Sequence, residues 1–282
     1  MEHETDFVAG RQQWLERLGN LRNVVRQDVI ARQLAGHVQD LARASRSAGQ
    51  PRRLTILDVG AGQGTQAIRL ARLGHEVTAV DPDPAMRACA ADLIAAEDPE
   101  TTARMQLRPG GLGGLATVLP GTAYDVVLCH GVFMYLPESA PAVAELAPFV
   151  APGGLLSLVV RNAAGLALRP ALQGRWSVVQ DLLDEVAAAR REGRDPSYTN
   201  EIGVRARADD VATLSEVCRV AGLGPVAHYG VRLVSDLVPV DAPAPTADEL
   251  EALVNAELRL GELDPYRQVA TLAHLLYRRP IG

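Results

Sequence analysis

Three closely spaced glycines follow an apolar stretch and precede a helix-forming one. They are Gly60, Gly62 and Gly64, and the carboxylate of Asp58 precedes the first of them by two residues. Glycine lets the backbone turn sharply and lets a ligand approach without a Cβ in the way. A second carboxylate, Asp81, ends the next apolar stretch, where it can accept hydrogen bonds from both hydroxyls of a ribose. The pattern predicts a nucleoside-binding turn. The alternative is a strand–turn–helix connection with incidental glycines.

The residue after the third glycine separates two kinds of nucleotide-binding turn. A dinucleotide fingerprint needs glycine at position 65, where Thr65 stands. The chain also contains no G-K-[ST] sequence, so we predict no phosphate-binding P-loop. The turn therefore favours a nucleoside ligand that lacks a pyrophosphate.

Cysteines and histidines form no recognisable metal or redox motif. Cys89, Cys129 and Cys218 are far apart, and the six histidines include no H-E-x-x-H. We therefore expect no metal. No apolar run reaches the roughly 18–20 residues that a membrane span needs, and the first residues lack the pattern of a signal peptide. We expect a cytoplasmic protein without a membrane partner.

The net charge of −6 is unevenly distributed. Residues 241–264 contain seven acids and one arginine, so they carry the whole excess and the remaining chain is balanced. Steering of a ligand depends on the local field and not on the total charge. Overall acidity therefore does not exclude an anionic substrate.

Strands that alternate with helices are expected to position the glycine turn. Helices are predicted at about 65–73, 84–96 and 138–150. Seven strands are predicted, at 54–59, 76–80, 105–108, 125–129, 155–160, 225–234 and 270–277. Short turns between such elements imply a mostly parallel α/β sheet with right-handed crossovers and helices on both faces.

We predict one domain over residues 1–282, in four segments. Residues 1–50 form an N-terminal helical extension, and residues 54–160 form the cofactor-binding core. Residues 161–210 are an Arg-rich insertion that caps the substrate site, and residues 211–282 contain the last strands and an acidic helix.

Three motifs in this order resemble the class I S-adenosylmethionine-dependent methyltransferases. They are the G-x-G-x-G turn at 60–64, the fourth-strand segment 124–136, and the segment 146–158 with its Pro-Gly-Gly turn. The resemblance covers about residues 54–160. It implies a Rossmann-like class I fold with a seven-stranded sheet, S-adenosyl-L-methionine as the cofactor, and methyl transfer as the activity.

Shorter stretches resemble the bacterial CmoM family, whose members methylate the carboxyl group of carboxymethoxyuridine in tRNA. The matching stretches are 25–34, 154–166, 221–233 and 264–266. The resemblance implies that the acceptor is a carboxylate, which becomes a methyl ester, with carboxymethoxyuridine of tRNA as one candidate acceptor. Positions matching that family's contacts, together with the glycine turn, make up the expected cofactor-binding set: Arg26, Asp58, Gly60, Ala61, Gly62, Gly64, Asp81, Leu112, Gly113 and His130.

The acceptor is expected to contact arginines. Arg26, Arg175 and Arg232 are the substrate-binding candidates. Five arginines of the insertion are expected to serve the acceptor as well, namely Arg190, Arg191, Arg194, Arg205 and Arg207. The catalytic candidates are His130 and Tyr135. An ionised carboxylate needs no general base, whereas a hydroxyl or amine acceptor would use His130 as its base.

Several alternatives remain open at this stage. The acceptor is either tRNA or a small-molecule carboxylate. Other possibilities are O- or N-methylation of a bacterial metabolite, or a non-catalytic protein that binds the cofactor. Asp58 alternatively orders the glycine turn, Tyr135 packs on the next helix, and Arg26 and Arg232 are solvated charges.

Overall fold

A computed structural model describes residues 10, 12, 13, 16, 19–44, 52–239 and 242–281. Much of the predicted extension at 1–50 therefore lies outside the described residues. The described part contains a seven-stranded sheet in the order β3-β2-β1-β4-β5-β9-β8. Its strands are β1 (Thr55–Val59), β2 (Glu76–Asp81), β3 (Met105–Pro109), β4 (Tyr124–His130), β5 (Val150–Arg161), β8 (Gly224–Val231) and β9 (Leu272–Arg278).

The sheet is mostly parallel, as predicted. Strands β1 to β5 pair in parallel, whereas β9 pairs antiparallel with both β5 and β8. Strand β1 carries four consecutive buried residues, which is typical of a strand covered on both faces. The carboxyl ends of the parallel strands consequently meet at one edge, where ligands bind in folds of this kind.

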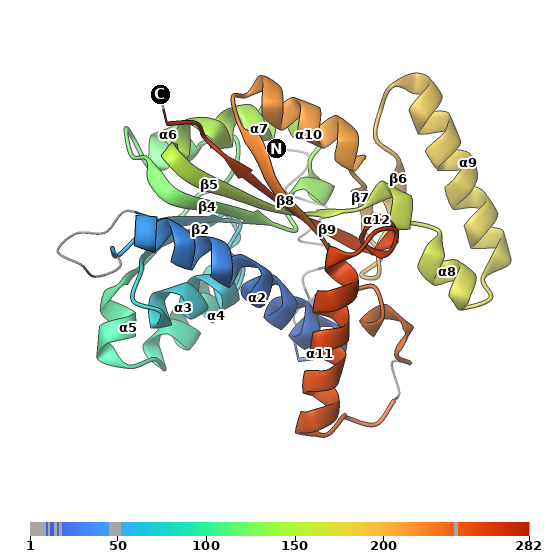
Figure 1. Ribbon diagram of the computed structural model, residues 1–282, viewed down its shortest axis with the longest axis horizontal. Coiled ribbons are helices and arrows are strands. Elements are labelled where there is room, and N and C mark those ends of the chain that lie inside the picture. Colours follow the sequence, from blue (N-terminus) through green and yellow to red (C-terminus); the bar gives the residue numbers. More distant parts are fainter. Residues whose placement is uncertain are drawn as a thin grey trace.

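Helices cover both faces of the sheet, as Figure 1 shows. The described helices are α2 (Leu21–Ala44), α3 (Thr65–Arg72), α4 (Pro84–Ala95), α5 (Pro99–Ala103), α6 (Leu115–Val118), α7 (Ser139–Leu146), α8 (Leu168–Leu172), α9 (Trp176–Glu192), α10 (Val211–Val220), α11 (Ala247–Glu262) and α12 (Tyr266–Val269). Helices α2 and α3 pack on one apolar core, and α7 and α10 pack on the other. Each fully buried Leu or Val in these cores contributes about 1.5–3 kcal/mol.

Two predicted boundaries differ from the structure. The helix expected at 138–150 ends at Leu146, and β5 begins at Val150 because this residue pairs with Tyr124. The strand expected at 225–234 ends at Val231, because Arg232 has a positive φ of 61° that interrupts the strand. The second difference matters for the site, since it turns Arg232 away from the regular strand geometry.

The insertion between β5 and α10 forms its own small layer. It contains α8, α9 and a two-stranded sheet of β6 (Ser197–Thr199) and β7 (Arg205–Arg207), which lie together at the right of Figure 1. The buried guanidinium of Arg207 anchors this layer. It bonds Asp195 and Asp209, the Ser139 hydroxyl, and the carbonyl oxygens of Phe133 and Leu136. The described helices include none that is long and apolar enough to cross a membrane.

Candidate functional site

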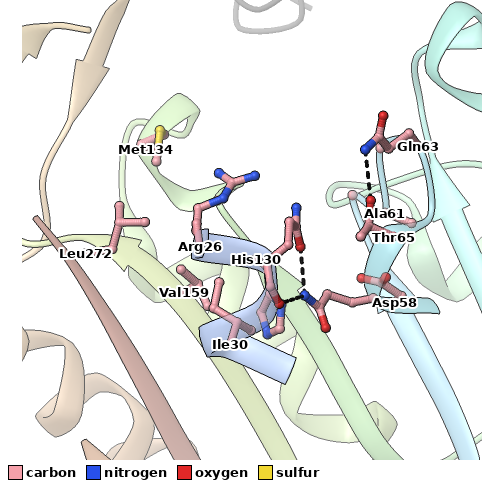
Figure 2. A pocket seen from close by; sticks show the side chains of 15 residues that line it. Arg26, Ile30, Asp58, Ala61, Gln63, Thr65, His130, Met134, Val159 and Leu272 are labelled. Carbon is pink, nitrogen blue, oxygen red and sulfur yellow. Dashed lines mark hydrogen bonds between the residues drawn. The ribbon is translucent and has the colours of Figure 1, made fainter. Parts of the chain in front are cut away.

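A cavity at the carboxyl end of β1 and β4 contains most of the predicted cofactor residues (Figure 2). We call it the donor pocket. Helix α2 contributes Arg26 and Ile30, the turn after β1 contributes Gly60 and Gly62, and His130 comes from the end of β4. The residues that line it are Arg26, Gln27, Ile30, Asp58, Gly60, Ala61, Gly62, Gln63, Thr65, Gln66, His130, Gly131, Met134, Val159 and Leu272.

The turn after β1 requires glycine for both conformation and space. Gly60, Gly62 and Gly64 all have positive φ, between 58° and 80°. A Cβ on Gly60 would lie 2.3 Å from Cγ2 of Val132, a distance that real Cβ atoms essentially never show. The turn therefore brings bare backbone to the pocket, as close approach of a nucleoside requires.

Two carboxylates lie at this turn, of which Asp58 lines the donor pocket and Asp81 does not. Oδ2 of Asp81 accepts a hydrogen bond from the Gly62 N–H at 2.7 Å, and burial raises the pKa of Asp81 despite this bond. Burial and the neighbouring charge of Asp81 raise the pKa of Asp58 to about 7. Such carboxylates suit a ligand that carries positive charge, because a cation would offset the cost of burying them.

His130 adds a polar atom without a partner. Its Nε2 lies 2.8 Å from the Ser157 hydroxyl, while its buried Nδ1 has no hydrogen-bond partner among the described residues. Burial, reinforced by the charge of Arg26, lowers the pKa of His130 to about 3. The bare backbone, the carboxylates and the unpartnered Nδ1 of His130 together fit a cationic nucleoside such as S-adenosylmethionine.

A second cavity, of about 460 Å³, adjoins the donor pocket, and we call it the acceptor pocket. Both cavities are lined by Arg26, Met134 and Leu272, so they share a wall. Six arginines and two acidic residues line the acceptor pocket; they are Arg22, Arg26, Arg161, Arg169, Arg175, Arg232, Asp181 and Glu201. The surplus of positive charge favours an anionic ligand there.

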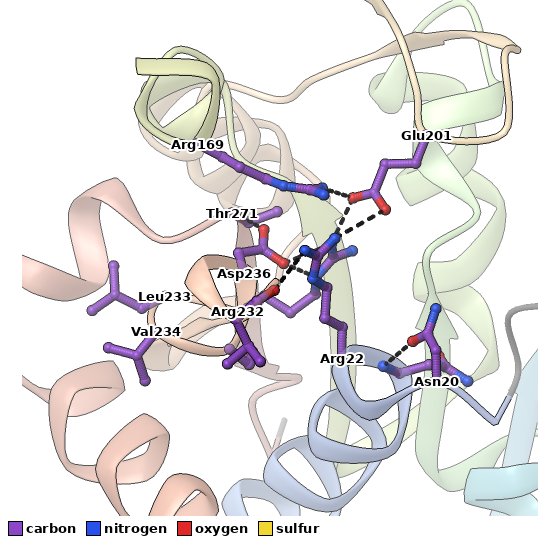
Figure 3. A network of polar contacts seen from close by, with 12 residues as sticks. Asn20, Arg22, Arg169, Glu201, Arg232, Leu233, Val234, Asp236 and Thr271 are labelled. Carbon is purple, nitrogen blue, oxygen red and sulfur yellow. Dashed lines mark hydrogen bonds and ion pairs between the residues drawn. The ribbon is translucent and has the colours of Figure 1, made fainter. Parts of the chain in front are cut away.

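Arg232 is already engaged by carboxylates. Its guanidinium bonds Glu201 at 2.7 Å and Asp236 at 2.8 Å, and Figure 3 shows Arg22 and Arg169 approaching the same Glu201. Burial alone would raise the pKa of Glu201, but attraction to Arg232 and Arg169 lowers it to about 2. Glu201 therefore stays ionised and links the turn between β6 and β7 to the arginines that line the acceptor pocket.

Arg161 stands apart from this network. It ends β5, its buried Nε has no hydrogen-bond partner, and no ion pair joins it to a carboxylate among the described residues. Its guanidinium carbon lies 5.1 Å from the centre of the Tyr198 ring, and burial lowers its pKa. Arg161 is not among the residues that the sequence predicted for the site, although its place at the carboxyl end of a sheet strand was a usable signal.

The remaining predicted residues do not line the donor pocket. Gly64 precedes α3 behind the turn, and Leu112 and Gly113 lie in the loop after β3. Glu145 holds that loop by accepting hydrogen bonds from the N–H groups of Gly113 and Leu115. Exposed Arg175 and largely enclosed Tyr135 both line the acceptor pocket, and burial raises the pKa of Tyr135.

The arginines of the insertion divide into different roles. Arg207 is the anchor described above, and Arg194 pairs with Glu185 and Glu192 within the insertion itself. Arg190 and Arg191 are exposed near the end of α9. None of these four lines the acceptor pocket.

Comparisons with known proteins identify a methyltransferase domain in this chain. Residues 57–156 match the family model of a methyltransferase domain. The tRNA 5-carboxymethoxyuridine methyltransferase of Escherichia coli (strain K12) is 28% identical over 242 residues, which cover 86% of each chain. A ubiquinone biosynthesis O-methyltransferase of Albidiferax ferrireducens is 35% identical over 100 residues, or 35% of this chain and 38% of the relative.

Solved structures confirm the predicted fold. Magnesium protoporphyrin IX methyltransferase from Synechocystis PCC 6803, solved with bound SAH, aligns with a TM-score of 0.56 at 16% identity, covering 96% of this chain and 94% of that one. The Burkholderia thailandensis 1,6-didemethyltoxoflavin-N1-methyltransferase aligns with a TM-score of 0.54 at 17% identity, covering 99% and 91%. The expected methyltransferase class and its cofactor, S-adenosylmethionine, are confirmed by the comparisons taken together.

Proposed function

We propose that this chain, a class I S-adenosylmethionine-dependent methyltransferase that resembles the tRNA carboxymethoxyuridine enzymes, methylates a carboxylate to a methyl ester. The observation that carries the proposal is Arg161. A guanidinium without a carboxylate partner, beside a cavity already rich in arginine, is a costly arrangement unless a ligand supplies the missing anion. A planar carboxylate matches the paired N–H groups of arginine.

The donor pocket holds the cofactor in this proposal. Asp81 accepts hydrogen bonds from the ribose, the glycine turn lies against the nucleoside, and Arg26 attracts the carboxylate of the methionine end. S-adenosylmethionine supplies a methyl group that its positively charged sulfur activates for displacement. The chain then has to align the acceptor oxygen with that methyl group at about 3 Å and exclude water.

The protonation states of the two catalytic candidates favour an acceptor that needs no base. The pKa of His130 is about 3, and that of Tyr135 is raised above its usual value, so neither removes a proton efficiently near neutral pH. A carboxylate is ionised above about pH 5 and can attack directly. In this proposal Tyr135 shapes the acceptor pocket, and His130 contacts the cofactor.

The carboxylate belongs in this proposal to carboxymethoxyuridine of tRNA, and the insertion at 161–210 caps the pocket that receives it. Support comes from the E. coli relative, whose name states that it methylates this nucleoside. A cytoplasmic location accompanies the proposal. A small-molecule carboxylate is the second candidate, because Arg194 and Arg207 are engaged inside the insertion and reduce the basic surface available to RNA.

Incubation with methyl-labelled cofactor and total bacterial tRNA tests the proposal. We expect label on the RNA, and its release by dilute alkali because methyl esters hydrolyse readily. Label that survives alkali would reject ester formation and indicate an N- or ether-linked methyl group. RNA without label, together with labelling of low-molecular-weight acids from a cell extract, would favour the second candidate.

A further inference from the structure

A chain of hydrogen bonds leads from His130 away from the donor pocket and across the face of the sheet that α2 covers. Nε2 of His130 lies 2.8 Å from the Ser157 hydroxyl on β5, which in turn lies 2.9 Å from Nε2 of His274 on β9. Nδ1 of His274 is 2.8 Å from Oε1 of Gln33 on α2. Ser157 and His274 are completely buried, and Gln33 is nearly so.

The donor and the acceptor of each bond can be assigned by starting from Gln33, at the end of the chain of hydrogen bonds. Gln33 donates through Nε2 to the carbonyl oxygen of Gly230 at 3.1 Å, which fixes the orientation of its amide. Its Oε1 can only accept, so Nδ1 of His274 must carry the proton. Burial holds the pKa of His274 well below its usual value, so this imidazole is neutral and its Nε2 has a lone pair.

The proton positions of Ser157 and His130 follow in the same way. A hydroxyl donates one hydrogen bond, and Ser157 must donate it to the lone pair of His274. Ser157 therefore accepts its second bond from His130, which places the proton of His130 on Nε2. Because His130 is neutral as well, its buried Nδ1 is left with an unprotonated lone pair on a ring that lines the donor pocket.

We propose that Gln33, Ser157 and His274 act as positioning residues that fix the tautomer of His130, so that Nδ1 accepts a hydrogen bond from the ammonium group of the bound cofactor. The methionine end of S-adenosylmethionine carries one carboxylate and one ammonium. Arg26 provides the cation for the carboxylate in the same cavity, and Nδ1 of His130 provides the acceptor for the ammonium. The inference rests on the donor pocket of the proposed function and not on the identity of the acceptor.

Nitrogen NMR of the ligand-free protein tests the tautomer directly. Full-length protein labelled with 15N-histidine, with signals assigned through a His130→Asn variant, should show protonated Nε2 on His130 and protonated Nδ1 on His274 from pH 6 to 8. A protonated Nδ1 on His130, or a mixture of its two tautomers, would overturn the proposal. This measurement does not depend on the cofactor or on activity.

Binding measurements test the consequence for the ligand. Ser157→Ala should weaken binding of S-adenosylhomocysteine about 3- to 10-fold, the usual effect of one hydrogen bond, and Ser157→Thr should restore it because the hydroxyl returns. Neither substitution should change the affinity for an S-adenosylhomocysteine analogue that lacks the α-amino group.

Two outcomes distinguish a failure of the hydrogen-bond chain from a failure of the donor pocket. If Ser157→Ala weakens the binding of both ligands equally, Ser157 only supports the fold, and its proposed role in fixing the tautomer of His130 is overturned. Failure of the wild-type protein to bind S-adenosylhomocysteine at all would overturn the donor pocket itself, whatever the tautomer of His130.

Discussion

At the scale of single residues, Asp58 gives the donor pocket a pH dependence. Its pKa of about 7 means that the carboxylate becomes ionised as the pH rises from 6 to 8. An ionised Asp58 attracts the fixed positive charge of the sulfonium, so affinity for S-adenosylmethionine should increase over this range. Affinity for S-adenosylhomocysteine, whose sulfur is neutral, should rise less. Calorimetric titrations at pH 6, 7 and 8 measure both ligands, and an equally steep rise for Asp58→Asn would contradict the assignment.

Arg161 makes a second prediction at this scale. Arg161→Gln should raise the KM of the acceptor about 10- to 100-fold, because one charge-assisted interaction of about 1.5–3 kcal/mol is lost. The affinity for the cofactor should stay within about twofold, since Arg161 does not line the donor pocket. Arg205→Gln is the matched control, because this exposed arginine of the insertion contacts only the Ser197 hydroxyl among the bonds described. A strong loss of cofactor binding in Arg161→Gln would refute the division into two pockets.

At the scale of elements, the attachment of the insertion depends on Arg207. Arg207→Ala leaves the buried carboxylate of Asp209 without its ion-pair partner, with only the Ser139 hydroxyl still bonded to it among the described residues, and removes the bonds that Arg207 donates to the loop after β4. Breaking a buried pair of this kind costs about 3–5 kcal/mol. We expect a clear loss of stability in urea denaturation, whereas Arg205→Ala, two residues away and exposed, should change it by less than about 0.5 kcal/mol. Similar unfolding midpoints for the two variants would show that the network contributes little.

The elements that the sequence predicted well are those whose pattern is local. The glycine turn, its flanking strands and the helix after it follow from spacing within a few residues, and the structure has them at Thr55–Val59 and Thr65–Arg72. The network around Glu201 was not predictable in this way. It joins α2, α8, the turn after β6 and the residue after β8, which are separated by many residues in the sequence and meet only in the folded chain.

At the scale of the whole molecule, the sequence predicted the fold class but not which arginines bind acidic residues of the protein and which remain available to a ligand. The order of strands and helices sufficed for a mostly parallel seven-stranded sheet. The sequence alone does not distinguish one arginine of the insertion from another. In the structure, Arg207 and Arg194 pair with acidic residues of the insertion, while Arg161 has no such partner. Burial and pairing determine which charges remain available to a ligand, and both arise from tertiary contacts.

The wall that both cavities share has a consequence for inhibitor chemistry. Because Arg26, Met134 and Leu272 border both spaces, one compound that joins an adenosine group to a carboxylate by a short linker can occupy both at once. Tethering converts the second contact into an intramolecular one, so such a bisubstrate compound should bind about 10²- to 10⁴-fold more tightly than its better fragment. Calorimetry with the linked and separate fragments measures the gain. Arg161→Gln should remove most of it while leaving the adenosine fragment bound, and an unchanged gain would place the carboxylate elsewhere.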